Sequence, residues 1–197
     1  MFWKNQDEVY IIAEAGDQHF GSLDTAFKLV DGAKNAGANC IKFQHHLPDE
    51  EMLPDVPMSS NFDQPLYEFL KENALNISQH KKVKDYCEKL NIDYLCTPFS
   101  LKAAHELLTI DVKFFKIGSG EMTDTPTVSA VADMGLPMIV STGMSTFEEI
   151  DRTYQLLIKK NIPIALMNCT SEYPPIYEDI NLKVIPLMQK RYPQATI

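Results

Sequence analysis

The chain has 197 residues, of which 45% are hydrophobic and 23% charged, a composition typical of globular proteins and unlike that of disordered or fibrous chains. Its 27 acidic and 18 basic side chains give a net charge of −9, and no long basic block is present, which argues against nucleic acid and membranes as partners. The first residues contain acids and no long apolar run, so we predict no secretory signal and a cytoplasmic location. The cysteines lack CxxC spacing and are interpreted as free or buried thiols.

Six short segments rich in apolar, β-branched or aromatic residues recur along the chain and predict six strands. Most of them lack strict alternation, as do strands that are covered on both faces in parallel sheets. The segments are VYIIAE from Val9, NCIKFQ from Asn39, IDYLCT from Ile92, VKFFKI from Val112, PMIVST from Pro137 and PIALMN from Pro163.

Stretches with the apolar spacing of a helix lie between these strands. Examples are residues 23–33, followed by Gly37, and residues 150–158, followed by Asn161. Residues 181–191 are predicted to form the sixth helix. Alternation of strands and helices indicates βαβ units with a parallel sheet, either doubly wound or closed into a barrel.

The connection between the second and third predicted strands is unusually long. Residues 45–64 are rich in Pro, Asp and Met, and they precede a helix predicted near residues 66–73. We therefore expect a long loop that could cover a site.

The first strand is not followed by a glycine-rich phosphate motif of the Rossmann or Walker type, which argues against a dinucleotide-binding fold. Polar residues instead cluster at or just after strand ends, where a (β/α)₈ TIM barrel builds its active site. Such a barrel needs eight strands in roughly 250 residues, whereas this chain contains six units and the start of a seventh strand at residues 194–197. We therefore expect an α/β chain that is a TIM barrel truncated after about six β/α units. Residues 1–197 would form an incomplete N-terminal domain.

A lysine stands inside the second predicted strand. Lys42 and Gln44 are two residues apart, so their side chains leave the strand on the same face. The lysine is either an edge or snorkelling residue or an anion ligand in a barrel mouth. We favour the anion ligand because Lys116 repeats the pattern in the fourth strand.

The segment FFKIGSGE carries two glycines around Ser119, with Glu121 following. Glycines allow a bulge or a close approach of backbone amides to a ligand. Alternation places Ser119 and Glu121 on one face and Lys116 on the other, unless the chain bulges near Gly118. The segment is equally compatible with a plain turn that places Glu121 at a helix start.

The segment STGM follows the fifth predicted strand. Ser145 or Thr146 is expected to cap the next helix, with Glu148 or Glu149 in its first turn. Capping does not account for Ser141, whose hydroxyl at the strand end is a suitable phosphate donor.

Three histidines, His19, His45 and His46, lie near the ends of predicted strands. Their spacing matches no HxxH or carboxylate-triad pattern, so we assign no metal ligand within the chain. We interpret them as loop histidines.

Together these motifs resemble the sialic acid synthase (N-acetylneuraminate synthase) family of phosphoenolpyruvate-condensing barrels. Six segments resemble the family's strand motifs, in the right order and over nearly the whole chain from about Val9. They are IIAEAGDQHFGS, IKFQ, CTPFS, FFKIGSGE, PMIVSTGMS and NCTSEYPPIYEDINL.

The resemblance implies a transferase of carbohydrate biosynthesis that condenses phosphoenolpyruvate with an N-acyl-mannosamine or a related amino-sugar aldehyde. It implies that Glu14 and Glu121 are catalytic, with Glu14 beside the reacting centre as an acid/base or orienting group. The residues implied to hold phosphoenolpyruvate are Lys42, Thr97, Lys116, Ser119 and Ser141. Those implied to contact the sugar are Gln44, Glu121, Ser171 and Tyr173.

Some positions differ from the family pattern or fall outside the chain. Gln18 stands where the family often has Asn, and Ser171 stands where some bacterial members have Asn, which bears on the choice of sugar. The resemblance implies a divalent metal, Mn²⁺ or Mg²⁺, held by two histidines that would lie beyond Ile197. The family's C-terminal antifreeze-like domain, which completes the active site in a homodimer, would also lie there.

Two alternatives remain open. The first is a related synthase of a 3-deoxy-ulosonate phosphate, against which the SEYPP segment argues. The second is a truncated, non-catalytic chain that binds a ligand, since an open barrel exposes strand edges and apolar surface.

Overall fold

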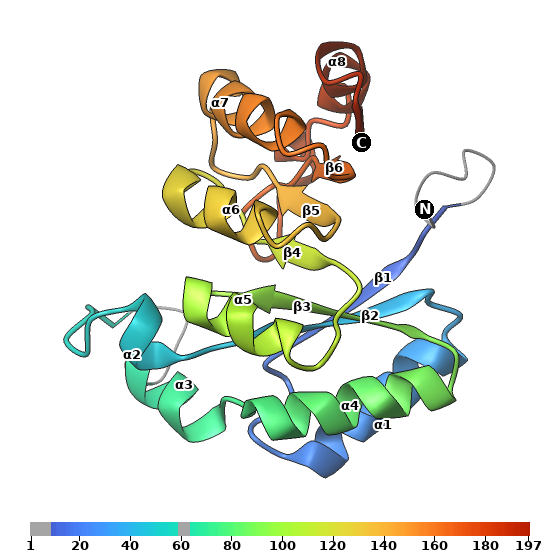
Figure 1. The fold of residues 1–197 in the computed structure, drawn as a ribbon, viewed down its shortest axis with the longest axis vertical. Coiled ribbons are helices and arrows are strands. Elements are labelled where there is room, and N and C mark those ends of the chain that lie inside the picture. The colour runs from blue at the N-terminus through green and yellow to red at the C-terminus, as the bar shows by residue number, and fades with distance from the viewer. Residues whose placement is uncertain (1–8, 59–63) are drawn as a thin grey trace. The chain divides into compact units, whose positions relative to one another are not determined.

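The computed structural model describes residues 9–58 and 64–197 (Figure 1). The chain divides into two compact units, of which the first ends at Val112 and the second spans Lys113–Ile197. We describe each unit by itself.

The first unit contains three parallel strands in sequence order. The register places Glu14 opposite Lys42 and Gln44 opposite Thr97, and a bulge follows Glu14. Helices α1 and α4 lie side by side against the strands (Figure 1). The elements are β1 (Ile12–Gly16), α1 (Leu23–Asn35), β2 (Cys40–His45), α2 (Pro48–Glu51), α3 (Leu66–Asn73), α4 (Ile77–Lys89), β3 (Asp93–Pro98) and α5 (Leu101–Leu108).

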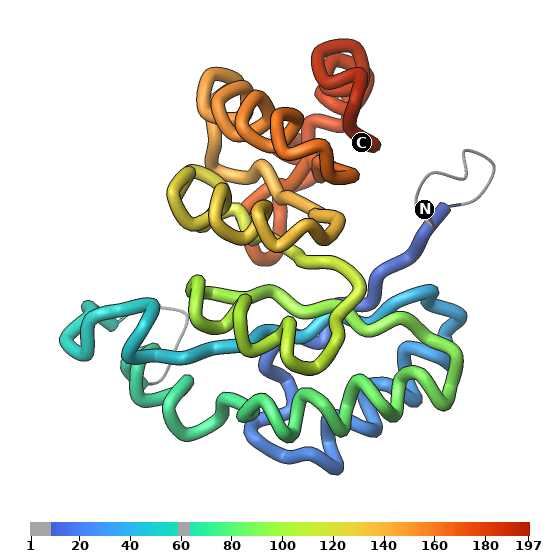
Figure 2. The backbone as a smooth tube through the Cα atoms, viewed as in Figure 1, coloured from blue at the N-terminus to red at the C-terminus, as the bar shows by residue number. Residues whose placement is uncertain are grey.

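The second unit contains four parallel strands, again in sequence order. The register places Lys116 opposite Ile139 and Ser141 opposite Met167. Helices α6 and α7 lie side by side (Figure 2). The elements are β4 (Phe115–Ile117), α6 (Thr125–Ala132), β5 (Met138–Ser141), α7 (Phe147–Ile158), β6 (Ile164–Met167), the 3₁₀ helix η2 (Tyr177–Asp179), α8 (Val184–Arg191) and β7 (Ala195–Thr196).

Local sequence signals account for the helix ends. Of the two predicted caps of α7, Ser145 and Thr146, the structure has Thr146, in a capping box with Glu149. After α1, Gly37 takes a φ of +82°, and after α7, Asn161 takes a φ of +54°. Glycine and asparagine adopt this left-handed region most readily, so the predicted stops are confirmed.

The core consists of side chains between the strands and the helices. Val30 of α1, Val83 of α4 and Phe43 of β2 are fully buried. Complete burial of one such side chain is worth about 1.5–3 kcal/mol relative to exposure. The central strands are buried on both faces, which explains why they read as continuous apolar runs rather than alternating ones.

The predicted α/β alternation and parallel strands are confirmed, including the start of a seventh strand. The predicted sixth helix is shorter than expected, because η2 precedes it and α8 begins only at Val184. The long connection after β2 contains the short helix α2, and residues 59–63 of this connection lie outside the described part. None of the helices in the described ranges is long and apolar enough to cross a membrane.

Candidate active site

A buried lysine lies in the middle of a strand of the first unit. Lys42 of β2 is only 8% exposed. Its ammonium forms an ion pair with Oε2 of Glu14 and lies 3.5 Å from the hydroxyl of Thr97. Three neighbouring strands therefore each supply one polar group around the Lys42 ammonium, with Glu14 directly opposite Lys42 and Thr97 one pleat further along β3.

This group has the properties of an anion site. A buried ammonium is costly unless a negative group compensates it, and Glu14 fulfils that role here. Oε1 of Glu14 also accepts a hydrogen bond of 3.0 Å from the amide of Gly16. The Glu14 side chain is 52% exposed, whereas the Lys42 side chain is 11% exposed, so the pair joins the interior to the surface.

The second unit contains an equivalent arrangement around Lys116, which is only 5% exposed. Its ammonium donates hydrogen bonds to the hydroxyl of Ser141, at 2.6 Å, and to the carbonyl of Ile117, at 2.7 Å. The thiol of Cys169 lies 3.3 Å from the same hydroxyl. Ser141 is therefore held by a cation at the end of β5, and capping of α7 does not involve it.

Ser119 reaches the same region by a route that the strand pattern did not reveal. β4 ends at Ile117, so strand alternation no longer applies at Ser119. Its hydroxyl accepts a hydrogen bond of 3.1 Å from the amide of Gly143. A Cβ at Gly143 would collide with the hydroxyls of Ser119 and Ser171, so glycine is what allows these three residues to meet.

Glu121 and Tyr173 are the remaining predicted residues of the second unit. The Glu121 carboxylate folds back onto Gly118, where a Cβ would collide with it. α6 begins at Thr125, and its N-cap is Asp124, so Glu121 does not lie in its first turn. Tyr173 is 96% exposed.

A cavity of about 430 Å³ opens beside these serines within the second unit. Sequence reasoning did not single out Asn168 or Asn181, because the segment after β6 carries no periodic signal. The cavity is lined by Thr142, Met144, Ser145, Thr146, Phe147, Ile150, Asn168, Cys169, Thr170, Asp179, Ile180, Asn181, Val184 and Met188. A hollow of about 650 Å³ along α7 lies on the outer surface of that helix, away from the strand ends.

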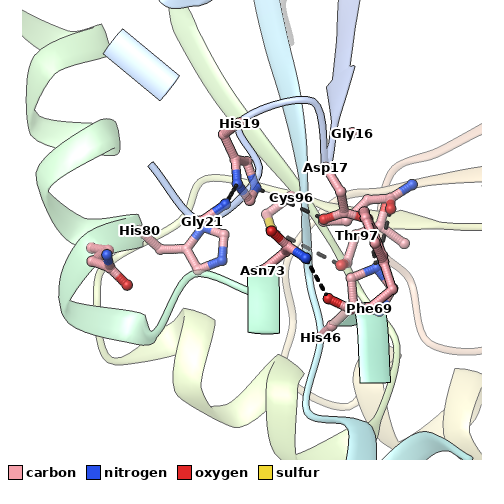
Figure 3. A network of polar contacts seen from close by, with 12 residues as sticks. Gly16, Asp17, His19, Gly21, His46, Phe69, Asn73, His80, Cys96 and Thr97 are labelled. Atoms are coloured by element: carbon pink, nitrogen blue, oxygen red, sulfur yellow. Dashed lines mark hydrogen bonds and ion pairs between the residues drawn. The ribbon is translucent and has the colours of Figure 1, made fainter. Parts of the chain in front are cut away.

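The interpretation as loop histidines is wrong for His45, which is the last residue of β2. It is confirmed for His19, which lies in a turn after β1, and for His46, which follows β2. All three side chains are nevertheless buried, which the sequence did not indicate. Burial lowers the pKa of His19 and of His45, although the neighbouring Asp17 and Glu106 act in the opposite direction. Figure 3 shows His19 and His46 on either side of Asp17.

A fourth buried histidine, His80 of α4, was not predicted from the sequence. Its Nδ1 lies 2.7 Å from the hydroxyl of Tyr94, and its ring packs edge-on against that of His45. Burial lowers the pKa of His80 far below the usual range, so this histidine is neutral. The sequence signal that could have identified His80 is its position, as a polar residue, on the inward face of an amphipathic helix.

These histidines do not form a metal centre. Within residues 9–58 and 64–197, no group of three or more His, Cys, Asp or Glu side chains is arranged to hold a metal ion. The described residues therefore offer no complete binding site for the divalent metal that the resemblance implies. The two histidines expected to bind this metal beyond Ile197 stay a prediction.

Comparison with known proteins shows which family the chain resembles. The sequence profile of the NeuB family matches residues 29–196. The N-acetylneuraminate-9-phosphate synthase of Drosophila melanogaster is 33% identical over 203 residues, covering 97% of this chain and 53% of that protein. The N,N'-diacetyllegionaminic acid synthase of Campylobacter jejuni is 32% identical over 191 residues, covering 92% of this chain and 57% of that protein.

A solved structure shows the same arrangement of the backbone. The N-acetylneuraminic acid synthetase of Leptospira borgpetersenii, crystallised with citrate, superposes with a TM-score of 0.86 at 32% identity. The match covers 93% of this chain and 62% of that one. The chain spans about half the length of the curated relatives that it matches.

Proposed function

Because the chain belongs to the NeuB family, we propose that it carries substrate-binding residues of a nonulosonic acid synthase. The reaction is condensation of phosphoenolpyruvate with an N-acyl-mannosamine-like aldehyde, with release of phosphate. The observation that supports this most directly is a buried lysine inside a strand of each unit, Lys42 and Lys116, each beside a hydroxyl. In a chain of net charge −9, two such cations require a functional reason. The fold we propose is the (β/α)₈ barrel.

Each set of residues, taken by itself, suits a charged group such as the phosphate or the carboxylate of phosphoenolpyruvate. Lys42 with Thr97, and Lys116 with Ser119 and Ser141, offer ammonium and hydroxyl donors. Charge-assisted hydrogen bonds from such donors are roughly twice as strong as neutral ones. We assign the phosphate and the carboxylate of phosphoenolpyruvate to these five residues.

The chemistry follows from the polarity of the two substrates. The enol carbon of phosphoenolpyruvate attacks the aldehyde carbon, and a C–C bond forms while the aldehyde oxygen takes up a proton. Water then adds to the cationic C2 and loses a proton, and the C2–oxygen bond to phosphate breaks to leave a ketone. Glu14 is the group we propose to move or orient a proton there, because its carboxylate is half exposed beside Lys42.

The remaining residues orient the sugar, and alignment with charge stabilisation supplies the rate. We propose Gln44, Glu121, Ser171 and Tyr173 for this role. The two relatives above form different acids, according to their names, so the acyl group and a 6-phosphate on the sugar are left to experiment. The alternative, a 3-deoxy-ulosonate phosphate synthase, has less support because these relatives carry nonulosonate activities in their names.

The test is release of phosphate from phosphoenolpyruvate in the presence of manganese. The aldehyde panel contains N-acetylmannosamine, its 6-phosphate, a diacetylated analogue, arabinose phosphate and erythrose phosphate. We would compare the 197-residue chain with a chain that continues past Ile197. Turnover with an amino sugar is expected for the longer chain. Failure with every amino sugar, or faster turnover with arabinose or erythrose phosphate, would refute the proposal.

The two lysines provide a sharper test of the binding residues. Lys42→Met and Lys116→Met should each weaken phosphoenolpyruvate binding at least about tenfold, measured by calorimetry, because each variant removes a charge-assisted contact. Lys102→Met and Lys190→Met remove exposed lysines from the same two units and serve as controls. Equal losses in the controls would show that net charge, rather than these two sites, governs binding.

A further inference from the structure

His46 lies in a buried cluster of the first unit from which the proposed chemistry uses only Gln44. The cluster consists of Asp17 after β1, Gln44 and His46 at the end of β2, Glu51 at the end of α2, and Phe99 after β3. The His46 side chain is only 6% exposed and that of Glu51 only 4%. Figure 3 shows His46 and Asp17 near Thr97, one of the predicted substrate-binding residues.

Both ring nitrogens of His46 face oxygen acceptors. Nδ1 lies 2.9 Å from Oε1 of Glu51. Nε2 lies 3.0 Å from Oε1 of Gln44 and 3.3 Å from Oδ2 of Asp17. The ring also stacks on Phe99 with centroids 4.1 Å apart.

Ionised carboxylates only accept hydrogen bonds, so both ring nitrogens must donate. The imidazole is therefore doubly protonated and positively charged. Burial lowers the pKa of His46, but the hydrogen bonds to Asp17 and Glu51 outweigh this and raise the pKa to about 9. The other titratable groups around the ring are His19 after β1, His45 of β2 and His80 of α4. Burial lowers the pKa of these three histidines, so the positive charge of the cluster resides on His46.

The charge on His46 determines how Gln44 presents its amide. Because Nε2 of His46 donates, Gln44 must turn its oxygen inward and its NH₂ group away. That NH₂ group and Oε1 of Glu14 both lie within 4.0 Å of where a Cβ on Gly16 would be. Gln44 therefore offers a hydrogen-bond donor on the same side as the Glu14 and Lys42 pair. A neutral His46 that donated from Nδ1 would accept at Nε2, and the amide would turn over.

We infer that His46 is a positioning residue that holds the Gln44 amide with its NH₂ group toward the amino-sugar substrate. It thereby selects a sugar that places an acceptor, a carbonyl or hydroxyl oxygen, at Gln44. This inference rests on the proposed function for the identity of the substrate. A site built to hydrogen-bond one oxygen of a substrate discriminates strongly against analogues that lack it.

The first arm of the test needs no turnover. In the ¹⁵N-labelled 197-residue chain, NMR would follow the His46 imidazole and the Gln44 side-chain amide as the pH rises. Both His46 nitrogens should stay protonated up to about pH 9, and the Gln44 NH₂ signals should move with the same midpoint. Glu51→Gln should lower that midpoint, whereas His105→Gln, which removes an exposed histidine of α5, should leave it unchanged. If the Gln44 NH₂ signals do not change at the pH where His46 titrates, the inference is overturned.

The second arm uses the chain that continues past Ile197. His46→Gln should raise the KM for N-acetylmannosamine at least about tenfold and change that for phosphoenolpyruvate little. Glu51→Gln should move the alkaline limb of the pH profile of turnover to lower pH. This variant replaces His46→Gln in the test if His46→Gln does not fold. An unchanged sugar KM, or an unmoved limb, overturns the role of His46. A wild-type chain that turns over no amino sugar refutes the proposed function, while the NMR arm still decides whether His46 sets the Gln44 amide.

Discussion

Replacing His46 by glutamine should remove a specific pH dependence from the stability of the first unit. Folding raises the pKa of His46 from 6.5 to about 9, since two carboxylates outweigh the effect of burial. The folded state therefore binds this proton more tightly than the unfolded state does. The resulting stabilisation is fully present below pH 6.5 and is lost as the pH rises through 9.

The magnitude follows from the size of the rise. One pH unit corresponds to about 1.36 kcal/mol, so a rise of about 2.5 units contributes about 3 kcal/mol near pH 6. By linkage, about 2 kcal/mol of this remains near pH 7.5 and less than about 0.5 kcal/mol near pH 9. Solvent screening reduces this little, because the side chain is 6% exposed.

Urea unfolding followed by far-ultraviolet circular dichroism measures the effect. The difference in unfolding free energy between wild type and His46→Gln should shrink by about 3 kcal/mol between about pH 6 and pH 9. His105→Gln is the matched control, because it removes an exposed histidine from the same unit. A difference that stays constant over this range would refute the assignment of the charge to His46.

Three further predictions concern other parts of the chain. Gly143→Ala should weaken phosphoenolpyruvate binding at least about tenfold in calorimetry, because the new methyl group displaces the Ser119 and Ser171 hydroxyls. Ser100→Ala should lower the free energy of unfolding in urea by about 1 kcal/mol, because Ser100 caps α5 by accepting from an amide. His80, whose pKa is lowered by burial, should make stability fall as the pH drops below 6.5, by up to about 1.4 kcal/mol per pH unit. His80→Gln should flatten that slope in acid urea titrations.

Each of these predictions has a result that would contradict it. Unchanged binding by Gly143→Ala would mean that the serine hydroxyls do not contact the ligand. Ser100→Asp keeps a capping oxygen and should retain stability, so an equal loss in both Ser100 variants would exclude capping as the cause. An acid slope that survives in His80→Gln would assign the effect to His19 or His45.

Several parts of the fold follow directly from local sequence. Each strand is a short apolar run, and the stops after α1 and α7 use Gly37 and Asn161, which tolerate positive φ. The cap of α7 follows from the Thr146 and Glu149 pair. These features depend on residues within one turn or one strand, so residues close together in the sequence suffice to predict them.

The candidate site was only partly predictable in this way. Lys42 and Gln44 belong to one regular strand, so their common face could be inferred from spacing alone. Spacing failed for Ser119, because the chain leaves β4 at Ile117 and the hydroxyl is then placed by the Gly143 amide of a different loop. Such a contact joins residues 24 positions apart and leaves no periodic trace.

The sequence by itself determined the order of strands and helices, the helix caps and the motifs that indicate the family. Only the tertiary structure decided the state of the histidines. Asp17 and Glu51 reach His46 from the segment after β1 and from α2, whereas His80 meets a tyrosine hydroxyl and no carboxylate. The same side chain therefore carries a charge in one place and is neutral in the other. The physical reason is that a pKa depends on burial and on nearby charges, and both are properties of the folded chain.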